Sequence, residues 1–208
     1  MMRTVLRIVG GAFQDLWADL WTVLACNLLW LIANLLIIPG PPATLGIVQY
    51  TNRLAHGEEV DFADFFKAFR RSWGLGWRWG AVNLAVVVFL VADIALTDQY
   101  QATTWSSLLQ GLYVTLLIFW LMVQLFALPF LFEQEHPSVW QAMRNGAVLI
   151  GRNLSFSMAL SLLVLIIMIV GTFAFLLSAM FGATFLACVG NRAVLNRLEE
   201  SRLAGSTS

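Results

Sequence analysis

The residues of this chain with the most versatile chemistry are few, and they lie in polar segments between long apolar runs. Glu133 and His136 have the Glu-x-x-His spacing of carboxylate-bridged metal sites. Those sites take this motif from two helices and add further glutamates, whereas this sequence has one copy. His56 is the only other histidine, and there is no glycine-rich phosphate loop or nucleophile elbow. We therefore expect no catalytic residues, no metal, no cofactor and no enzymatic activity.

Polar side chains inside the apolar runs form a second group of candidates. They are Asn27, Asn34, Asn83, Asp93 and Gln124. Polar groups are costly in hydrocarbon unless they are paired, so we expect them to face the interior of a helix bundle. Two interpretations stay open. They hydrogen-bond the helices to one another, or they line a path for a solute or an ion.

The composition identifies the class of protein that positions these residues. Hydrophobic residues make up 60% of the 208 residues and charged residues 12%, which is roughly half the charge of a soluble domain. The net charge is zero, so no global field favours nucleic acid. Cys26 and Cys188 lie inside apolar runs, where we expect neither a disulfide nor a metal. The sequence predicts one all-α transmembrane domain over residues 1–208.

Six segments are apolar enough to be membrane crossings of a polytopic helical bundle, although about 20 residues are needed to cover about 30 Å. The predicted spans are 20–38, 41–54, 79–97, 105–132, 153–171 and 173–191. The second is short, so it is either a tilted crossing or a re-entrant half-helix. If it returns the chain, six crossings place all twelve basic residues on one side, whereas five crossings would separate Arg3 and Arg7 from the others. The charge pattern favours six. By the positive-inside rule that side is the cytoplasm, and it holds both termini of a multi-pass protein.

Two amphipathic helices are predicted on the cytoplasmic face, at about 61–73 and 137–150. The first carries an aromatic face made by Phe62, Phe65, Phe66, Phe69 and Trp73. The second carries Trp140 and Arg144, and Pro137 suits its first helical position. An apolar face opposite charged residues is typical of a helix in the membrane interface. Such helices either shield their own bundle or dock a protein partner.

Several landmarks occur in the order of a known family. They are Asn-Leu-Leu-Trp-Leu-Ile at 27–32, the turn Gly-Pro-Pro-Ala-Thr-Leu-Gly at 40–46, Gly-Glu-Glu-Val at 57–60, the phenylalanine-rich 62–73, Leu-Pro-Phe at 128–130 and Asn-Gly-Ala at 145–147. Over about residues 13–200 this order resembles the YesL-type membrane proteins of bacteria, a family catalogued as a domain of unknown function. The resemblance implies a plasma-membrane protein often encoded beside carbohydrate ABC-transport genes, and it implies no catalytic residues.

Together these patterns favour a non-enzymatic accessory protein that supports or regulates a carbohydrate ABC-type importer. Its expected partners are the lipid bilayer and other proteins of a membrane complex, and not nucleic acid. One alternative is a small solute transporter, motivated by the intramembrane polar residues. Another is a structural subunit of some other membrane complex.

Overall fold

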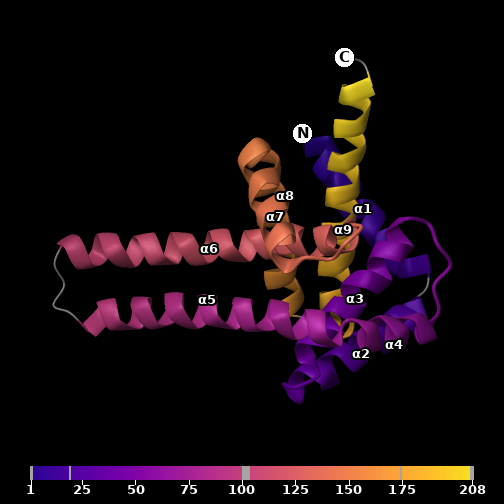
Figure 1. Cartoon of the computed structure of the whole chain (residues 1–208), viewed down its shortest axis with the longest axis horizontal. Helices are drawn as coiled ribbons and strands as arrows, with labels where there is room; N and C mark the ends of the chain where they lie inside the picture. The colour runs from indigo at the N-terminus through magenta and orange to yellow at the C-terminus, as the bar shows by residue number, and fades with distance from the viewer. Residues whose placement is uncertain (1, 19, 100–103, 174, 207–208) are drawn as a thin grey trace.

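The computed structural model describes residues 2–18, 20–99, 104–173 and 175–206, which form nine helices and no strand (Figure 1). The helices are α1 (Met2–Ala18), α2 (Leu20–Leu35), α3 (Gly40–Ala55), α4 (Phe62–Arg71), α5 (Trp73–Gln99), α6 (Thr104–Phe132), α7 (Val139–Arg152), α8 (Leu154–Phe173) and α9 (Phe175–Ser206). The prediction of an all-α fold is confirmed.

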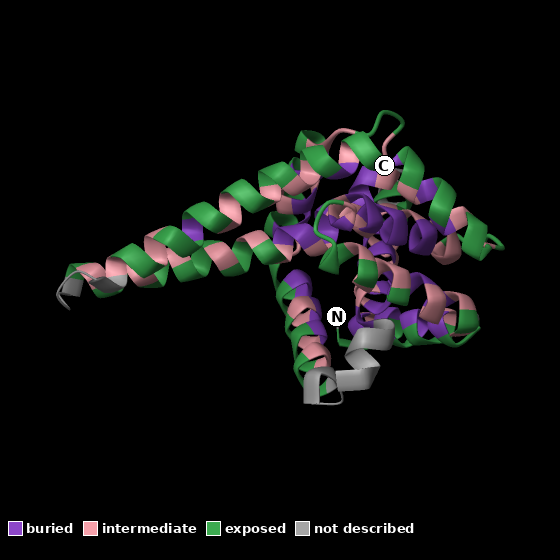
Figure 2. Ribbon diagram, turned by 90° about the horizontal axis from the view of Figure 1, so that it is seen from below, coloured by how far each residue is buried: buried purple, intermediate pink, exposed green. Residues whose placement is uncertain are grey.

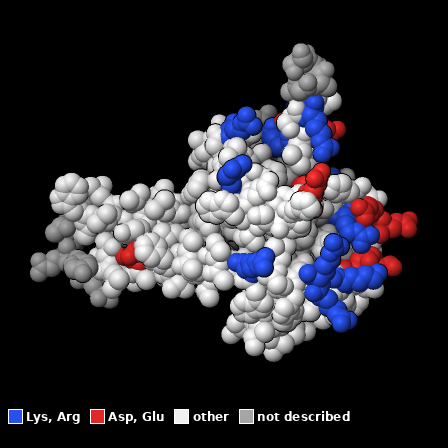
Figure 3. Space-filling model, viewed as in Figure 1, with Lys and Arg blue, Asp and Glu red and all other residues white. Residues whose placement is uncertain are grey.

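A long antiparallel hairpin of α5 and α6 extends away from the other helices (Figure 1). With 27 and 29 residues, these helices are about 40 Å long at 1.5 Å per residue. We call residues 81–99 and 104–120 the arm, and the rest of the described chain the body. The arm is mostly exposed, whereas buried residues gather in the body (Figure 2). Nearly all charged side chains visible in Figure 3 also lie on the body.

The centre of the body is α3, in which ten of 16 residues are buried. It contacts α2, α4, α5, α6 and α9. Its first turn touches the start of α5 so closely that a Cβ at Gly76 would lie 2.7 Å from the backbone of Pro42. A Cβ at Gly80 would lie 2.8 Å from Pro41. Glycine at these two positions therefore lets the base of the arm pack against the beginning of α3.

Among the described residues, two helices are long and apolar enough to cross a membrane, α5 and α6. The number rises to four if two bent pairs each count as one span: α1 with α2, bent by 97°, and α7 with α8, bent by 107°. Each pair joins an amphipathic helix to an apolar one. The structure thus gives two to four candidate spans where the sequence predicts six.

Some helix boundaries differ from the predicted ones. Trp73 begins α5 instead of ending the preceding helix, because the chain bends at Ser72. Pro137 precedes α7, whose N-cap is Ser138. The sequence places the boundary between the last two spans at residues 171–173, and α8 continues to Phe173. Finally, α9 continues beyond the predicted end of the last span at residue 191 and ends at Ser206. Residues 192–206 contain no proline that would stop the helix.

Candidate functional site

Two indole–amide hydrogen bonds join α5 to α6 at the base of the arm. Trp79 Nε1 donates to Gln124 Oε1 at 2.9 Å, and Trp120 Nε1 donates to Asn83 Oδ1 at 2.7 Å. The amide nitrogen of Gln124 points to the sulfur of Met143 on α7, 3.5 Å away. Two of the predicted intramembrane polar residues, Asn83 and Gln124, are therefore used in contacts between helices.

Asn27 joins α2 to α9 inside the body. Its Oδ1 accepts the backbone N–H of Ala183 at 3.1 Å, and both the N–H and the hydroxyl of Thr184 at 3.2 Å. Asn27 and Thr184 are both fully buried. Asn27 therefore faces the interior of the body.

Asn34, seven residues later, has a different environment. Its side chain is exposed and donates to the carbonyl of Trp30 in its own helix, at 2.8 Å. Its Oδ1 would lie 3.0 Å from a Cβ at Gly40, so it packs on the turn between α2 and α3. In that turn Ile37 has a positive φ of 63°, which costs about 1–2 kcal/mol for a β-branched residue. Asn34 therefore serves the turn and does not face the interior.

Asp93 is the acidic residue whose side chain is described within the arm. Oδ2 of Asp93 is buried and has no hydrogen-bond partner among the described residues. Its backbone carbonyl accepts the hydroxyl of Thr97 at 2.6 Å.

A buried polar cluster that the sequence did not indicate joins the ends of α3 and α6 to α9. Asn52 donates to Glu133 Oε1 at 2.7 Å and to Asn191 Oδ1 at 3.2 Å. Asn191 in turn donates to the hydroxyl of Thr51 at 2.9 Å. His56 Nε2 lies 3.6 Å from the same Glu133 oxygen. Glu133 thus faces His56 and not His136, because residues 133–136 are not helical and the Glu-x-x-His spacing defines no common face there.

A second unanticipated pair fixes α1 on α9. Arg192 forms two hydrogen bonds with the carboxylate of Asp15, both at 2.5 Å. The guanidinium lies over Gly11, where a Cβ would be 2.5 Å from Nη1. The absence of a side chain at Gly11 therefore makes room for the ion pair. A distance of 177 residues in sequence explains why neither pattern nor spacing predicted it.

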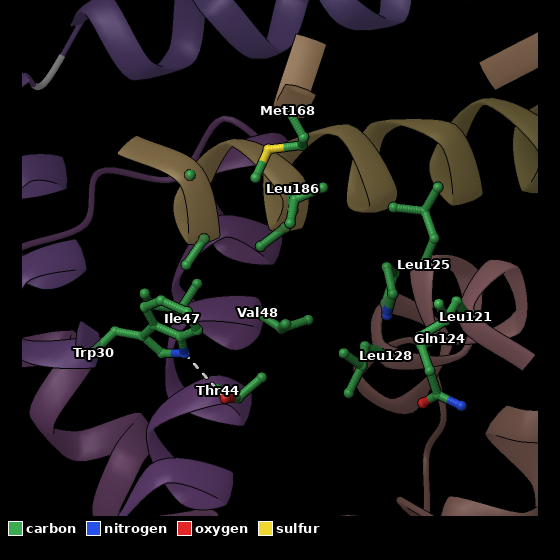
Figure 4. Close-up of a pocket in the computed structure, with 14 residues that line it drawn as sticks. Trp30, Thr44, Ile47, Val48, Leu121, Gln124, Leu125, Leu128, Met168 and Leu186 are labelled. Carbon is green, nitrogen blue, oxygen red and sulfur yellow. Dashed lines mark hydrogen bonds between the residues drawn. The ribbon is translucent and has the colours of Figure 1, made fainter. Parts of the chain in front are cut away.

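A cavity of about 340 Å³ lies between α6 on one side and α2 and α3 on the other. Figure 4 shows Trp30, Ile47 and Val48 facing Leu125 and Leu128 across it, with Met168 of α8 and Leu186 of α9 also lining it. Its polar groups are already bonded: Trp30 Nε1 donates to Thr44 Oγ1 at 3.0 Å, which donates to the Gly40 carbonyl at 3.0 Å. Its walls therefore present hydrocarbon.

The predicted aromatic face of residues 61–73 is divided by the fold. Phe65 is 3% exposed and packs on α3 at Gly46, so it is not accessible to a partner. Phe62, Phe66 and Trp73 remain exposed, and Phe69, partly buried, contacts Trp73 edge to face with ring centroids 5.5 Å apart. An aromatic strip next to Lys67, Arg70 and Arg71 is therefore open to the surroundings.

The buried face of the helix predicted at 137–150 does not include Trp140. The buried residues of α7 are Ala142, Met143, Gly146, Leu149 and Ile150. Gly146 sets this face, because a Cβ there would lie 3.1 Å from the backbone of Ala127 on α6. Trp140, 79% exposed, and Arg144 point away from the body, one turn apart.

The start of α4 carries a pH-sensitive contact. The backbone N–H of Asp61 donates to Asp64 Oδ2 at 3.0 Å, and Lys67 Nζ lies 3.0 Å from Oδ1. These contacts, the first of them above all, lower the pKa of Asp64 from 3.8 to about 2. Because the folded pKa is depressed, the stabilisation is present above about pH 4 and is lost as the pH falls towards 2.

We expect the difference in thermal stability between the wild type and Asp64→Asn to shrink over that interval, as measured by differential scanning fluorimetry in detergent. Comparing the two proteins cancels the titration of the other carboxylates. A difference that stayed constant from pH 6 to about pH 2 would contradict the role of the Asp64 carboxylate.

Residues 23–94 match a family model described as a protein of unknown function, DUF624. This is the YesL-type family, so the match confirms the resemblance over α2 to α5. No curated protein and no solved structure was found to match the chain.

Proposed function

Taking the family match over residues 23–94 as the premise, we propose that this chain is a non-enzymatic accessory protein of the bacterial plasma membrane. Its proposed role is to support or regulate a carbohydrate ABC-type importer, the partner class that the YesL resemblance implies. The observation that carries the accessory role is the arm. In the apolar window of α5, only 6% of the residues are buried within the chain's own fold.

An apolar hairpin of this length suits a membrane, because backbone groups are satisfied within each helix. The body of the protein covers little of the arm, so most of the arm's surface is exposed, including Leu84, Phe89 and Leu108. Helices in lipid associate through packing and occasional hydrogen bonds, not through hydrophobic burial. The arm therefore offers a surface against which the membrane helices of a larger assembly can pack.

We further propose that α2 and α3 enter the membrane and return without crossing it. The turn between them, residues 35–38, is apolar and between 63% and 74% exposed. Its backbone N–H groups at 36, 37 and 38 all bond to nearby carbonyls, as hydrocarbon requires. The contact of Pro41 and Pro42 with the base of α5 supports a re-entrant pair, since it keeps the start of α3 away from the tip of the arm.

The proposed orientation has both termini, α4 and α7 in the cytoplasm. It is supported by the cluster of Asn52, Glu133 and Asn191, which brings together the ends of three predicted spans that the charge pattern assigns to the inside. The near right angle between α7 and α8 also suits a helix that lies in the interface beside one that enters the membrane.

The solute-transporter alternative has less support. A transport path needs polar groups that are free to bind the solute, whereas Asn27, Asn83 and Gln124 are bonded to other helices. The cavity at the centre of the body has apolar walls. These contacts favour the interpretation that the polar residues hold helices together.

Photo-crosslinking in living cells tests the accessory role. The photoreactive amino acid p-benzoylphenylalanine is introduced at Phe89 or Leu108, which are 62% and 61% exposed, and at Leu90, which is 6% exposed, as a matched control. We expect the two exposed positions to give an adduct with a membrane subunit of an importer, and Leu90 to give none. Mass spectrometry of the adduct identifies the partner.

Recovery of the chain alone from native membranes, with no protein adduct from either exposed position, would count against an accessory role. Flux of a solute into vesicles containing only this chain would favour the transporter alternative instead.

A further inference from the structure

A second cavity, polar where the first is apolar, opens between the end of α6, α7 and the last third of α9. Its volume is about 530 Å³. Its apolar lining includes Phe130, Leu149 and Leu198. Its polar lining comprises Asn145, Arg152, Asn153, Arg197, Glu200 and Ser201. No part of the proposed accessory role uses this cavity.

The charges that line the cavity are two arginines and one glutamate. Arg197 is held in place: Nη1 pairs with Glu200, and the guanidinium carbon lies 3.6 Å above the ring centre of Phe156. Its Nε has no hydrogen-bond partner among the described residues. Arg152 is exposed and forms no ion pair with the residues that the structure describes. After Glu200 is matched with Arg197, one arginine remains without a counter-charge.

The backbone adds to this positive character. The apolar helix α8 begins at Leu154, directly after Asn153. Its N-terminus carries the positive end of a 20-residue helix dipole. The side-chain amides of Asn145 and Asn153 supply further possible hydrogen-bond donors.

The position of the cavity in the fold indicates which chemical class of ligand it binds. It lies at the corner between amphipathic α7 and apolar α8, whose residues Leu154, Met158 and Leu162 are exposed. In a membrane this corner is the level of the lipid headgroups. Basic pockets at that level suit phosphate, because the planar guanidinium can form two hydrogen bonds with its oxygens.

We propose that this cavity binds a phosphate group, with Arg152 as its exposed charged contact and Arg197, held by Glu200 and Phe156, as its fixed one. The phosphate can belong to an anionic phospholipid or to a soluble phosphorylated molecule. Both sources share the same chemistry, and the experiment below separates them.

The test uses the full-length protein and two probes, phosphatidylglycerol in mixed micelles and inorganic phosphate in solution. Binding is measured by native mass spectrometry for the lipid and by thermal shift for phosphate. Arg152→Gln removes the exposed charged contact, and Arg144→Gln removes an exposed arginine of the same helix that does not line the cavity. We expect Arg152→Gln to weaken binding roughly tenfold and Arg144→Gln to leave it unchanged.

Preferential binding of phosphatidylglycerol over phosphatidylcholine, lost in Arg152→Gln and not displaced by phosphate, supports the lipid source. Binding of inorganic phosphate without lipid preference supports the soluble source. Equal behaviour of the two arginine variants, or no binding of either probe, would overturn the proposal. Asn145→Leu provides a second variant. Unchanged binding in both Asn145→Leu and Arg152→Gln would also overturn the proposal.

Discussion

Replacing Gly190 with alanine is expected to destabilise the protein by up to about 2 kcal/mol, even though alanine is the better helix former. A Cβ at this position would lie 2.6 Å from the carbonyl oxygen of Leu125 and 3.1 Å from Cγ of Pro129. The first of these contacts is with backbone, so α9 or α6 must move. Overpacking of this kind costs about 1–3 kcal/mol, against a propensity gain of about 1 kcal/mol.

The carbonyl of Leu125 is available for this contact because of Pro129. Proline has no N–H, so the carbonyl four residues earlier lacks its helical donor. Gly190 lies against that oxygen and brings its neighbour Asn191 within reach of Asn52. A shift of α9 should therefore weaken the polar cluster at the end of α3 as well.

Gly182→Ala is the matched control, since it lies on the same helix and its nearest neighbour would be the flexible end of Met168 at 3.5 Å. We expect Gly182→Ala to be neutral or to stabilise by up to about 1 kcal/mol. The midpoint of unfolding by SDS in mixed micelles, followed by tryptophan fluorescence, measures both variants. Equal midpoints would show that α9 does not approach α6 as closely as the structure indicates.

What the sequence predicts well is local. Helix over each long apolar run and the amphipathic character of 61–73 follow from run length and periodicity, which depend on neighbouring residues. The helix boundaries near Ser72 and Ser138 shift by a few residues, as capping and bends decide them.

What the sequence does not predict depends on contacts between distant residues. The apolar helices α2 and α8 of the body are at least as hydrophobic as α5, so composition alone does not separate the arm from the helices of the body. That division depends on Gly76 and Gly80 meeting Pro42 and Pro41. The ion pair Asp15–Arg192 and the polar cluster around Asn191 also join residues that are far apart in the sequence. Polar residues are expected at the ends of any membrane span, so their presence there does not indicate that they contact one another.

Asn27 and Asn34 show the same limit within one helix. Spacing by seven residues correctly gives them one face of α2, but α9 covers only the part of that face that contains Asn27. Sequence periodicity describes a face, and the tertiary fold decides how much of it is buried.

Asn27→Leu is therefore expected to destabilise the protein by about 2 kcal/mol, whereas Asn34→Leu should change its stability by less than about 0.5 kcal/mol. The first variant removes the acceptor for two backbone N–H groups and one hydroxyl in a fully buried environment. Such contacts between membrane helices contribute about 0.6 kcal/mol each on average. Leucine also has no polar atom to replace Oδ1. The second variant removes one exposed bond within the same helix.

SDS unfolding of the two variants beside the wild type measures this difference, and Thr184→Val provides a partial removal of the same contact. We expect Thr184→Val to fall between the wild type and Asn27→Leu, because it loses the hydroxyl bond and keeps both backbone bonds. If Asn27→Leu were as stable as the wild type but abolished flux of a solute in vesicles, the residue would belong to a transport path. If Asn27→Leu lost stability and the wild type showed no flux, the role of Asn27 would instead be to hold α2 against α9.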